Sequence, residues 1–209
     1  MVKDGGRRIR VENSVKTVKT ATLHVGLGCV RLVTSCAAHL RIFVNGEMLE
    51  WDEFQRCAKE IELLSASIDD GWHFVEEKDK PGYLEKRTVF RDPQNHELVI
   101  KGLYHVVYSL SYEVPVLYFN MWRQDGSLVP LNEVWAISGT EQSDWWSTIT
   151  QQEHPILHTP FFQLHPCKTQ DLMKQLRSQG GHGNYLVTWL SMVGPMAALT
   201  VPTEYAKLS

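Results

Sequence analysis

Several kinds of sequence feature are missing from these 209 residues, and each absence excludes a class of protein. The apolar stretch at 186–198 is too short to cross a bilayer, so no transmembrane helix is predicted. Neither a GxxxxGK[ST] nor a GxGxxG motif is present, which leaves nucleotide chemistry without support. The formal net charge is −3, whereas dedicated nucleic-acid-binding proteins carry an excess of basic charge. We therefore expect neither a membrane-spanning chain nor a nucleic-acid partner.

Cysteine is scarce, and its spacing is irregular. The chain has four cysteines, and no two of them have CxxC spacing. This arrangement predicts neither a disulfide framework nor the paired cysteines of a typical zinc site. We therefore expect a reducing compartment and predict a cytoplasmic protein. The hydrophobic fraction of 43% is sufficient for the core of one domain.

Basic charge is concentrated at the beginning of the chain. Residues 1–47 contain eight Lys and Arg against three acidic residues, which leaves the remainder strongly acidic. We interpret this segment as a poorly ordered basic extension, and a mitochondrial targeting segment is the alternative. Met48 directly precedes the first strong structural pattern, so the main domain is predicted to span residues 48–209.

The main domain is predicted to be α+β. Apolar residues recur at three- and four-residue steps over 50–68, which is typical of an amphipathic helix. Four strands without intervening helices then predict an antiparallel four-stranded meander at Trp72–Val75, 83–90, 104–112 and 116–123. Gly102 is expected to mark a bulge or the effective beginning of the third strand. Later helices are predicted at 131–137, 170–178 and Tyr185–Val193, the last capped by Asn184.

Cys167 has the sequence surroundings of a reactive thiol. Thiols react as thiolates, and a helix N-terminus lowers the pKa of a nearby thiol. Lys168 adds a positive charge, and Thr169 is a suitable N-cap for the helix that follows. We therefore predict Cys167 as a nucleophile at a strand-to-helix transition, with a buried structural cysteine as the alternative.

Two other kinds of chemistry remain open at this point. His154, His158, His165 and Cys167 offer four possible zinc ligands, although prolines interrupt any helix between the histidines. A cysteine hydrolase would need a base beside the thiol, and an extended segment would place His165 on the same side as Cys167. Trp145 and Trp146 could bind a partner, or they could pack on the sheet.

Three runs of residues carry a resemblance to a known family. They resemble the autophagy E2-like conjugating enzymes, and most closely the autophagy-related protein ten family, over about residues 49–207. The runs are Gln151-Gln152-Glu153-His154-Pro155-Ile156-Leu157 with Pro160-Phe161-Phe162-x-Leu164-His165-Pro166-Cys167-Lys168-Thr169; Tyr112-Glu113-Val114-Pro115-Val116-Leu117-Tyr118-Phe119; and Trp189-Leu190-Ser191-Met192-Val193-Gly194-Pro195.

The resemblance implies an E2-like fold and a group-transfer reaction. An E1-like activating enzyme would pass a ubiquitin-like modifier, autophagy-related protein twelve, to Cys167 as a thioester. A lysine of the acceptor, autophagy-related protein five, would then take the modifier. No cofactor is implied. The alternatives are the branch of the family that transfers a modifier to a lipid, and a non-catalytic adaptor.

The resemblance leaves the stabilisation of the transition state open. Ubiquitin E2 enzymes place a His-Pro-Asn upstream of their cysteine, whereas this chain has no His-Pro-Asn, and its second His-Pro is in His154-Pro155-Ile156. Candidates for the group that polarises the thioester carbonyl are backbone N–H groups at the helix start, Asn120 and Tyr118. His165 is a candidate base, and water or the acceptor protein could instead receive the lysine proton.

Overall fold

The computed structural model describes residues 10–12, 19–25, 28–34, 41–44, 49–138, 149–166, 169–178 and 183–208. The chain divides into two compact parts, Met1–Glu47 and Met48–Ser209. Cys167, Lys168, Trp145 and Trp146, which the sequence analysis singled out, lie outside the described residues.

The first part contains one small antiparallel sheet. Neighbouring strands pair antiparallel in chain order, β1-β2-β3-β4. The prediction that residues 1–47 are poorly ordered stays a prediction, and so does the domain boundary at Met48. The strands are Arg10–Glu12 (β1), Lys19–Val25 (β2), Gly28–Thr34 (β3) and Arg41–Val44 (β4).

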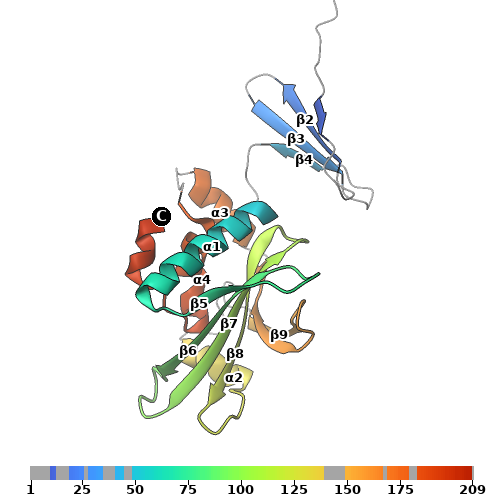
Figure 1. Ribbon diagram of the computed structural model, residues 1–209. Helices are drawn as coiled ribbons and strands as arrows, with labels where there is room; N and C mark the ends of the chain where they lie inside the picture. Colours follow the sequence, from blue (N-terminus) through green and yellow to red (C-terminus); the bar gives the residue numbers. More distant parts are fainter. Residues whose placement is uncertain are drawn as a thin grey trace, which may run out of the picture. The chain divides into compact units, whose positions relative to one another are not determined.

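The second part is α+β, as predicted, with a helix at its beginning, one antiparallel sheet and helices at its end (Figure 1). Its sheet has six strands in the order β5-β6-β7-β8-β10-β9. The elements are α1 (Trp51–Ile68), β5 (Trp72–Val75), β6 (Tyr83–Arg91), β7 (Val99–Ser109), β8 (Val114–Arg123), α2 (Leu131–Ser138), β9 (Ile149–Glu153), β10 (Pro160–Leu164), α3 (Thr169–Ser178), α4 (Tyr185–Val193) and the 3₁₀ turns η2 (Gly194–Ala197) and η3 (Thr203–Leu208).

The predicted four-stranded sheet is a correct account of β5 to β8 but misses two strands. β9 and β10 form a hairpin, and β10 pairs with β8. The sequence of β9, Ile-Thr-Gln-Gln-Glu, has no alternation of apolar and polar residues, and four of its five side chains are at least partly exposed. An edge strand of this kind is held by its backbone pairing, which leaves no hydrophobic pattern in the sequence.

Two predicted features of the third strand are wrong. The alternation continues to Tyr112, but β7 ends at Ser109 because the chain turns there, with Glu113 N–H donating to Ser109 O across 2.7 Å. Gly102 is not a bulge, since it pairs in regular register with Thr88 and with Met121. A Cβ at residue 102 would lie 2.7 Å from the ring of Tyr104, so the glycine leaves room for that ring.

Helix α1 covers one face of the sheet through a stripe of buried residues. Phe54, Cys57, Ala58 and Ile61 are fully or almost fully buried, which confirms the spacing predicted from the sequence. The helix ends at Asp69, whose left-handed backbone conformation (φ 56°) stops it where the sequence places Asp69-Asp70-Gly71. Cys57 is therefore a core residue.

The C-terminal helices lie on the same face of the sheet as α1 and complete the larger core (Figure 1). Asn184 caps α4, as predicted, by accepting a hydrogen bond from Val187 N–H. Its amide also donates to Cys57 O and to Glu60 Oε2, so one side chain joins α4 to α1. Among the described residues, no helix is both long and apolar enough to cross a membrane.

A smaller cluster occupies the other face of the sheet. Strand alternation turns Tyr104 toward the helices and His105 away from them. The smaller cluster is closed by the connection between β9 and β10, residues 154–159, which folds back over the strands. Its buried hydrophobic members are Tyr83, Val107, Val116, Tyr118, Ile156 and Phe161.

Candidate active site at the β10–α3 connection

The two segments that flank Cys167 are both described. β10 ends at Leu164, and α3 begins at Thr169, so the predicted strand-to-helix transition is present on both sides of the cysteine. Successive Cα atoms are about 3.8 Å apart, which keeps the Cα atom of residue 167 within about 8 Å of the Cα atoms of His165 and Thr169.

Thr169 and His165 differ from their predicted settings. Thr169 is buried and is the first residue of α3, whereas the sequence analysis placed it before the helix as its N-cap. His165 is exposed and lies beyond the end of β10. The extended segment that would place His165 and Cys167 on one side stops at Leu164. A role for His165 as a base thus stays a prediction without that support.

The turn between β7 and β8 contacts the segment that leads to Cys167. The rings of Tyr112 and His165 meet edge to face, with their centroids 6.4 Å apart. Tyr112 is 49% exposed, and Leu110 in the same turn is 79% exposed. Tyr112 belongs to the second run of residues that resembles the autophagy enzymes, but the sequence analysis gave it no function. Its contact with His165 arises from tertiary folding, for which the sequence carried no local signal.

Asn120 and Tyr118, the candidate oxyanion donors, hold β10 against β8. The Nδ2 of Asn120 donates to Pro160 O across 3.0 Å, and the Tyr118 hydroxyl accepts from Gln163 Nε2 across 3.1 Å. Both side chains are buried, with 7% and 8% exposed. Their role in polarising a thioester carbonyl stays a prediction, while the observed contacts give both residues a structural role at β10.

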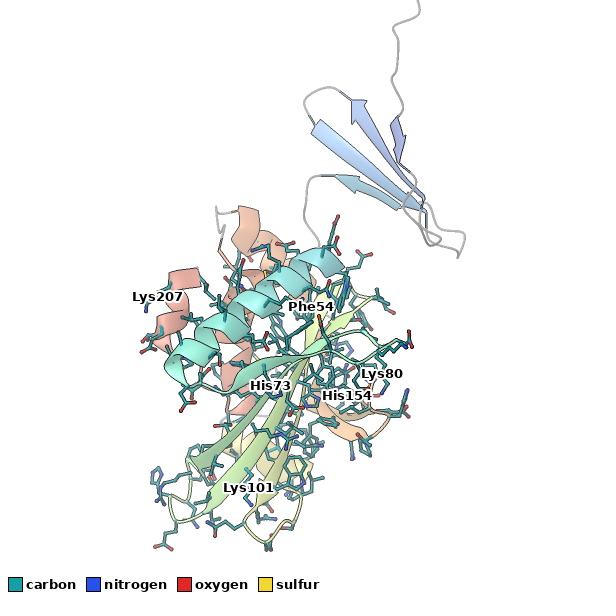
Figure 2. All side chains as sticks on the ribbon, viewed as in Figure 1. Phe54, His73, Lys80, Lys101, His154 and Lys207 are labelled. Carbon is teal, nitrogen blue, oxygen red and sulfur yellow. The ribbon has the colours of Figure 1, made fainter. Side chains whose placement is uncertain are left out.

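Two buried histidines meet where the β9–β10 connection begins: His154 (labelled in Figure 2), which starts the connection, and His105 of β7. His154 Nε2 is 3.0 Å from His105 Nδ1, and His105 Nε2 is 3.1 Å from Glu85 Oε2. His105 Nε2 makes no hydrogen bond of good geometry with Glu85, so this close contact is electrostatic. The two histidines are 49 residues apart in the chain, and no sequence spacing predicted that they would meet.

The hydrogen bonds determine which nitrogen of each ring carries the proton. His154 Nδ1 accepts the backbone N–H groups of Ile156 and Leu157, at 3.3 and 3.2 Å. We therefore assign the proton of His154 to Nε2, from which it is donated to His105 Nδ1. The proton of His105 is then on Nε2, facing Glu85. The arrangement requires both rings to be neutral.

The surroundings of the pair favour this neutral state. Burial lowers the pKa of His105 to about 4, although the neighbouring Glu85 carboxylate opposes that change. Burial also lowers the pKa of His154 to about 4, with His105 and His158 contributing. The aromatic rings of Tyr83, Tyr118 and Phe161 surround the pair, with centroid distances of 4.7 to 5.7 Å.

The histidines that suggested a zinc site have separate partners. His154 is paired with His105, whereas His158 is exposed and lies 2.8 Å from Glu153 Oε1. Within the described ranges, no three His, Cys, Asp or Glu side chains are grouped so as to hold a metal ion. Cys57 is buried and burial raises its pKa, so the thiol of Cys57 is in a setting that disfavours the reactive thiolate.

The chain is similar to known proteins along most of its length. The family described as autophagocytosis associated protein, active-site domain, matches residues 17–204, which includes much of the first part of the chain. The ubiquitin-like-conjugating enzyme ATG10 of Homo sapiens is 47% identical over 120 residues, covering 52% of this chain and 54% of the relative. The enzymes of the same name from Arabidopsis thaliana and Dictyostelium discoideum are 39% and 38% identical over 114 and 122 residues, covering 48% and 50% of this chain and 50% and 53% of the relatives.

The extent of these matches establishes the family. The chain spans about half the length of the curated relatives it matches, so the activity of the whole relatives does not pass to it directly. The family match, by contrast, covers far more than half of the chain. The chain therefore belongs to the autophagocytosis associated proteins and carries their active-site domain.

Proposed function

We propose that this chain is an E2-like conjugating enzyme of autophagy, with Cys167 as the residue that carries the modifier. The observation that carries the proposal is the match of residues 17–204 to the active-site domain of this family. Relatives from three distant organisms are named as ubiquitin-like-conjugating enzymes. The arrangement of helix, antiparallel sheet and C-terminal helices is consistent with an E2-like fold.

The proposed reaction consists of two acyl transfers. The thiolate of Cys167 attacks the carbonyl carbon of the modifier's C-terminal thioester on the E1-like enzyme, and the E1 thiolate leaves. A lysine amine of the acceptor then attacks the new thioester, an isopeptide bond forms and the Cys167 thiolate leaves. The amine proton passes to solvent or to a group on the acceptor. We propose autophagy-related protein twelve as the modifier and autophagy-related protein five as the acceptor, with the reaction in the cytoplasm.

The described surroundings of Cys167 suit this chemistry. α3 begins two residues after Cys167 in the chain, and a helix start offers backbone N–H groups and the positive end of the helix dipole, which favour a thiolate and a developing oxyanion. His165 is exposed and Tyr112 is half exposed, so the segment that precedes residue 167 is accessible to a large protein partner. Transfer between proteins requires this access, because the modifier and the acceptor must both reach the sulfur.

The test is to trap the modifier on the chain. With purified E1-like enzyme, modifier and ATP, wild-type protein should form an adduct that a thiol reductant cleaves. The Cys167→Ser variant should accumulate an oxyester that resists the reductant. Cys57→Ala is the matched control, because Cys57 is buried in the core, and it should load normally.

Other outcomes would identify other functions. A non-catalytic adaptor would form no adduct, and Cys167→Ala would leave its cellular function intact. A lipid-conjugating enzyme would transfer the modifier to a phospholipid in preference to an acceptor lysine. A cysteine hydrolase would release the modifier from a model conjugate without E1-like enzyme or ATP. Each of these results contradicts the proposal.

A further inference from the structure

β10 precedes Cys167 in the chain, and few backbone hydrogen bonds join it to the central strands of the sheet. Only Phe162 and Gln163 pair with β8, whereas all five residues of β10 pair with β9. β9 is itself the edge strand of the sheet. The position of the β9–β10 hairpin against the sheet must therefore depend strongly on side-chain contacts.

The buried histidines supply such contacts. The rings of His105 and His154 lie 5.1 and 4.9 Å from the ring of Phe161 in β10. His105 belongs to β7, in the centre of the sheet, and His154 begins the β9–β10 connection, so their hydrogen bond joins the hairpin to the sheet. His154 also orders the connection itself: its ring accepts two N–H groups, its own N–H donates to Thr159 O, and its carbonyl accepts from His158 N–H.

Glu85 completes the arrangement from β6. Its Oε2 faces His105, while its other oxygen lies 2.8 Å from Arg87 Nε and 3.7 Å from His73 Nε2. The rings of Tyr83 and Tyr118 also pack on the pair, and His158 acts electrostatically on His154. A polar chain thus runs from a carboxylate on β6, across β7, to the backbone of the connection that precedes β10.

We infer that Glu85, His105 and His154 form a positioning network that fixes the β9–β10 hairpin on the sheet and thereby sets the approach of the chain to Cys167. These three side chains are positioning residues, and they act through the contacts of the two histidines with Phe161 and with the connection that precedes β10. This inference rests on the proposed function, because its consequence is the rate at which Cys167 takes up the modifier. A reacting atom displaced by about 1 Å can lose on the order of a hundredfold in rate.

Two substitutions of His154 each remove one of its two kinds of hydrogen bond, the bond to His105 or the bonds to the backbone of the connection. In His154→Asn, the amide oxygen can replace Nδ1 as acceptor for Ile156 and Leu157 N–H, but the link to His105 is lost. In His154→Gln, the longer amide can reach His105 with an N–H, but the local acceptor is lost. The matched control is His158→Asn in the same connection, since the His158 side chain is 71% exposed and its ion-pair partner, Glu153, is exposed as well.

The test measures single-turnover thioester formation, at saturating charged E1-like enzyme and at a temperature where all variants are folded. Both His154 variants should load about tenfold more slowly or worse, whereas His158→Asn should stay within about twofold of wild type. Adding His105→Asn to His154→Asn should cause little further loss, because members of one network are not additive. Folded His154 variants that load within about twofold of wild type would overturn the inference.

A second measurement does not depend on the variants. Imidazole nitrogen NMR of the wild-type protein at neutral pH should show His105 and His154 protonated only at Nε2, with slowly exchanging ring protons. A His154 ring protonated at Nδ1 would overturn the network even if the His154 variants fail to fold. If wild type forms no thioester at all, the proposed function fails, while this NMR pattern still tests the network by itself.

Discussion

His154 donates its ring N–H to His105 across 3.0 Å, and the two side chains are 0% and 1% exposed. Each ring offers the other only one compatible protonation state, because His154 Nδ1 already accepts two backbone N–H groups. A proton added to His154 would therefore have no acceptor, and it would face the N–H groups of Ile156 and Leu157. The pair is stable only while neutral.

This relationship predicts that the protein loses stability in mild acid. The pKa of each histidine falls from an ordinary 6.5 to about 4 on folding, so the unfolded chain binds more protons between these values. The stabilisation is complete above pH 6.5 and is lost as the pH falls toward 4. One such histidine contributes up to about 3 kcal/mol. Thermal unfolding measured from pH 7.5 to 4.5 should show a falling midpoint, and His154→Asn should flatten that dependence. An equal slope in both proteins would contradict the account.

The contact between Tyr112 and His165 predicts a role for the β7–β8 turn in the reaction. Tyr112→Ala removes the ring that packs on His165, two residues before the thiol, and should slow thioester formation by about tenfold. Tyr112→Phe keeps the ring and should be close to wild type. Leu110→Ala is the control, because that side chain is 79% exposed in the same turn. A normal rate in Tyr112→Ala would show that the ring contact is dispensable.

Asn120 has two possible roles, and hydrogen exchange separates them. If Asn120 mainly holds β10, Asn120→Ala should speed amide exchange in β10 by about fivefold, because a net hydrogen bond of about 1 kcal/mol is lost. Exchange in the distant β5 should not change. If Asn120 is an oxyanion donor only, transfer of the modifier should slow while exchange in β10 stays at the wild-type rate. We expect the faster exchange.

Asn184 predicts a stability effect without a catalytic one. Its side chain caps α4 and bonds to Cys57 O and Glu60 on α1, so Asn184→Ala should lower the free energy of unfolding by about 2 to 3 kcal/mol. Asn95→Ala should cost about 1 kcal/mol or less, since its one side-chain bond, to Glu97 N–H, is exposed. Denaturant unfolding gives both values, and similar costs for the two variants would argue against the proposed link between the helices.

Local patterns in the sequence were enough to predict the elements whose apolar residues recur at regular spacing or whose ends carry a capping residue. The apolar stripe of α1 and the Asn184 cap of α4 are each encoded within a few residues, and both are confirmed. β9 escaped prediction because an exposed edge strand carries no alternation. His105 received no role from the sequence, because Glu85 lies on β6 and His154 lies in the β9–β10 connection, and no local pattern joins these segments. Contacts across the sheet carry no signal in one sequence.

The candidate site also contains residues that local sequence patterns identify and residues whose contacts only the structure shows. Cys167 was identified from its immediate neighbours, because the helix start and the basic residue beside it are local features. Asn120 and Tyr118 were chosen as polar groups of the sheet, and the structure shows them bonded to β10. Tyr112 received no role, since only folding brings it to His165. The assignment of roles around the thiol therefore needed the tertiary structure.

Mapping the ester bond of the trapped adduct by mass spectrometry tests the central claim most directly. After reaction of Cys167→Ser with E1-like enzyme, modifier and ATP, digestion should yield one branched peptide, with the modifier's C-terminal glycine joined to residue 167. The same digest of Cys57→Ala, trapped without reductant, should place a thioester on Cys167. A modifier attached at any other residue, or full conjugation of the acceptor by Cys167→Ala, would contradict the account.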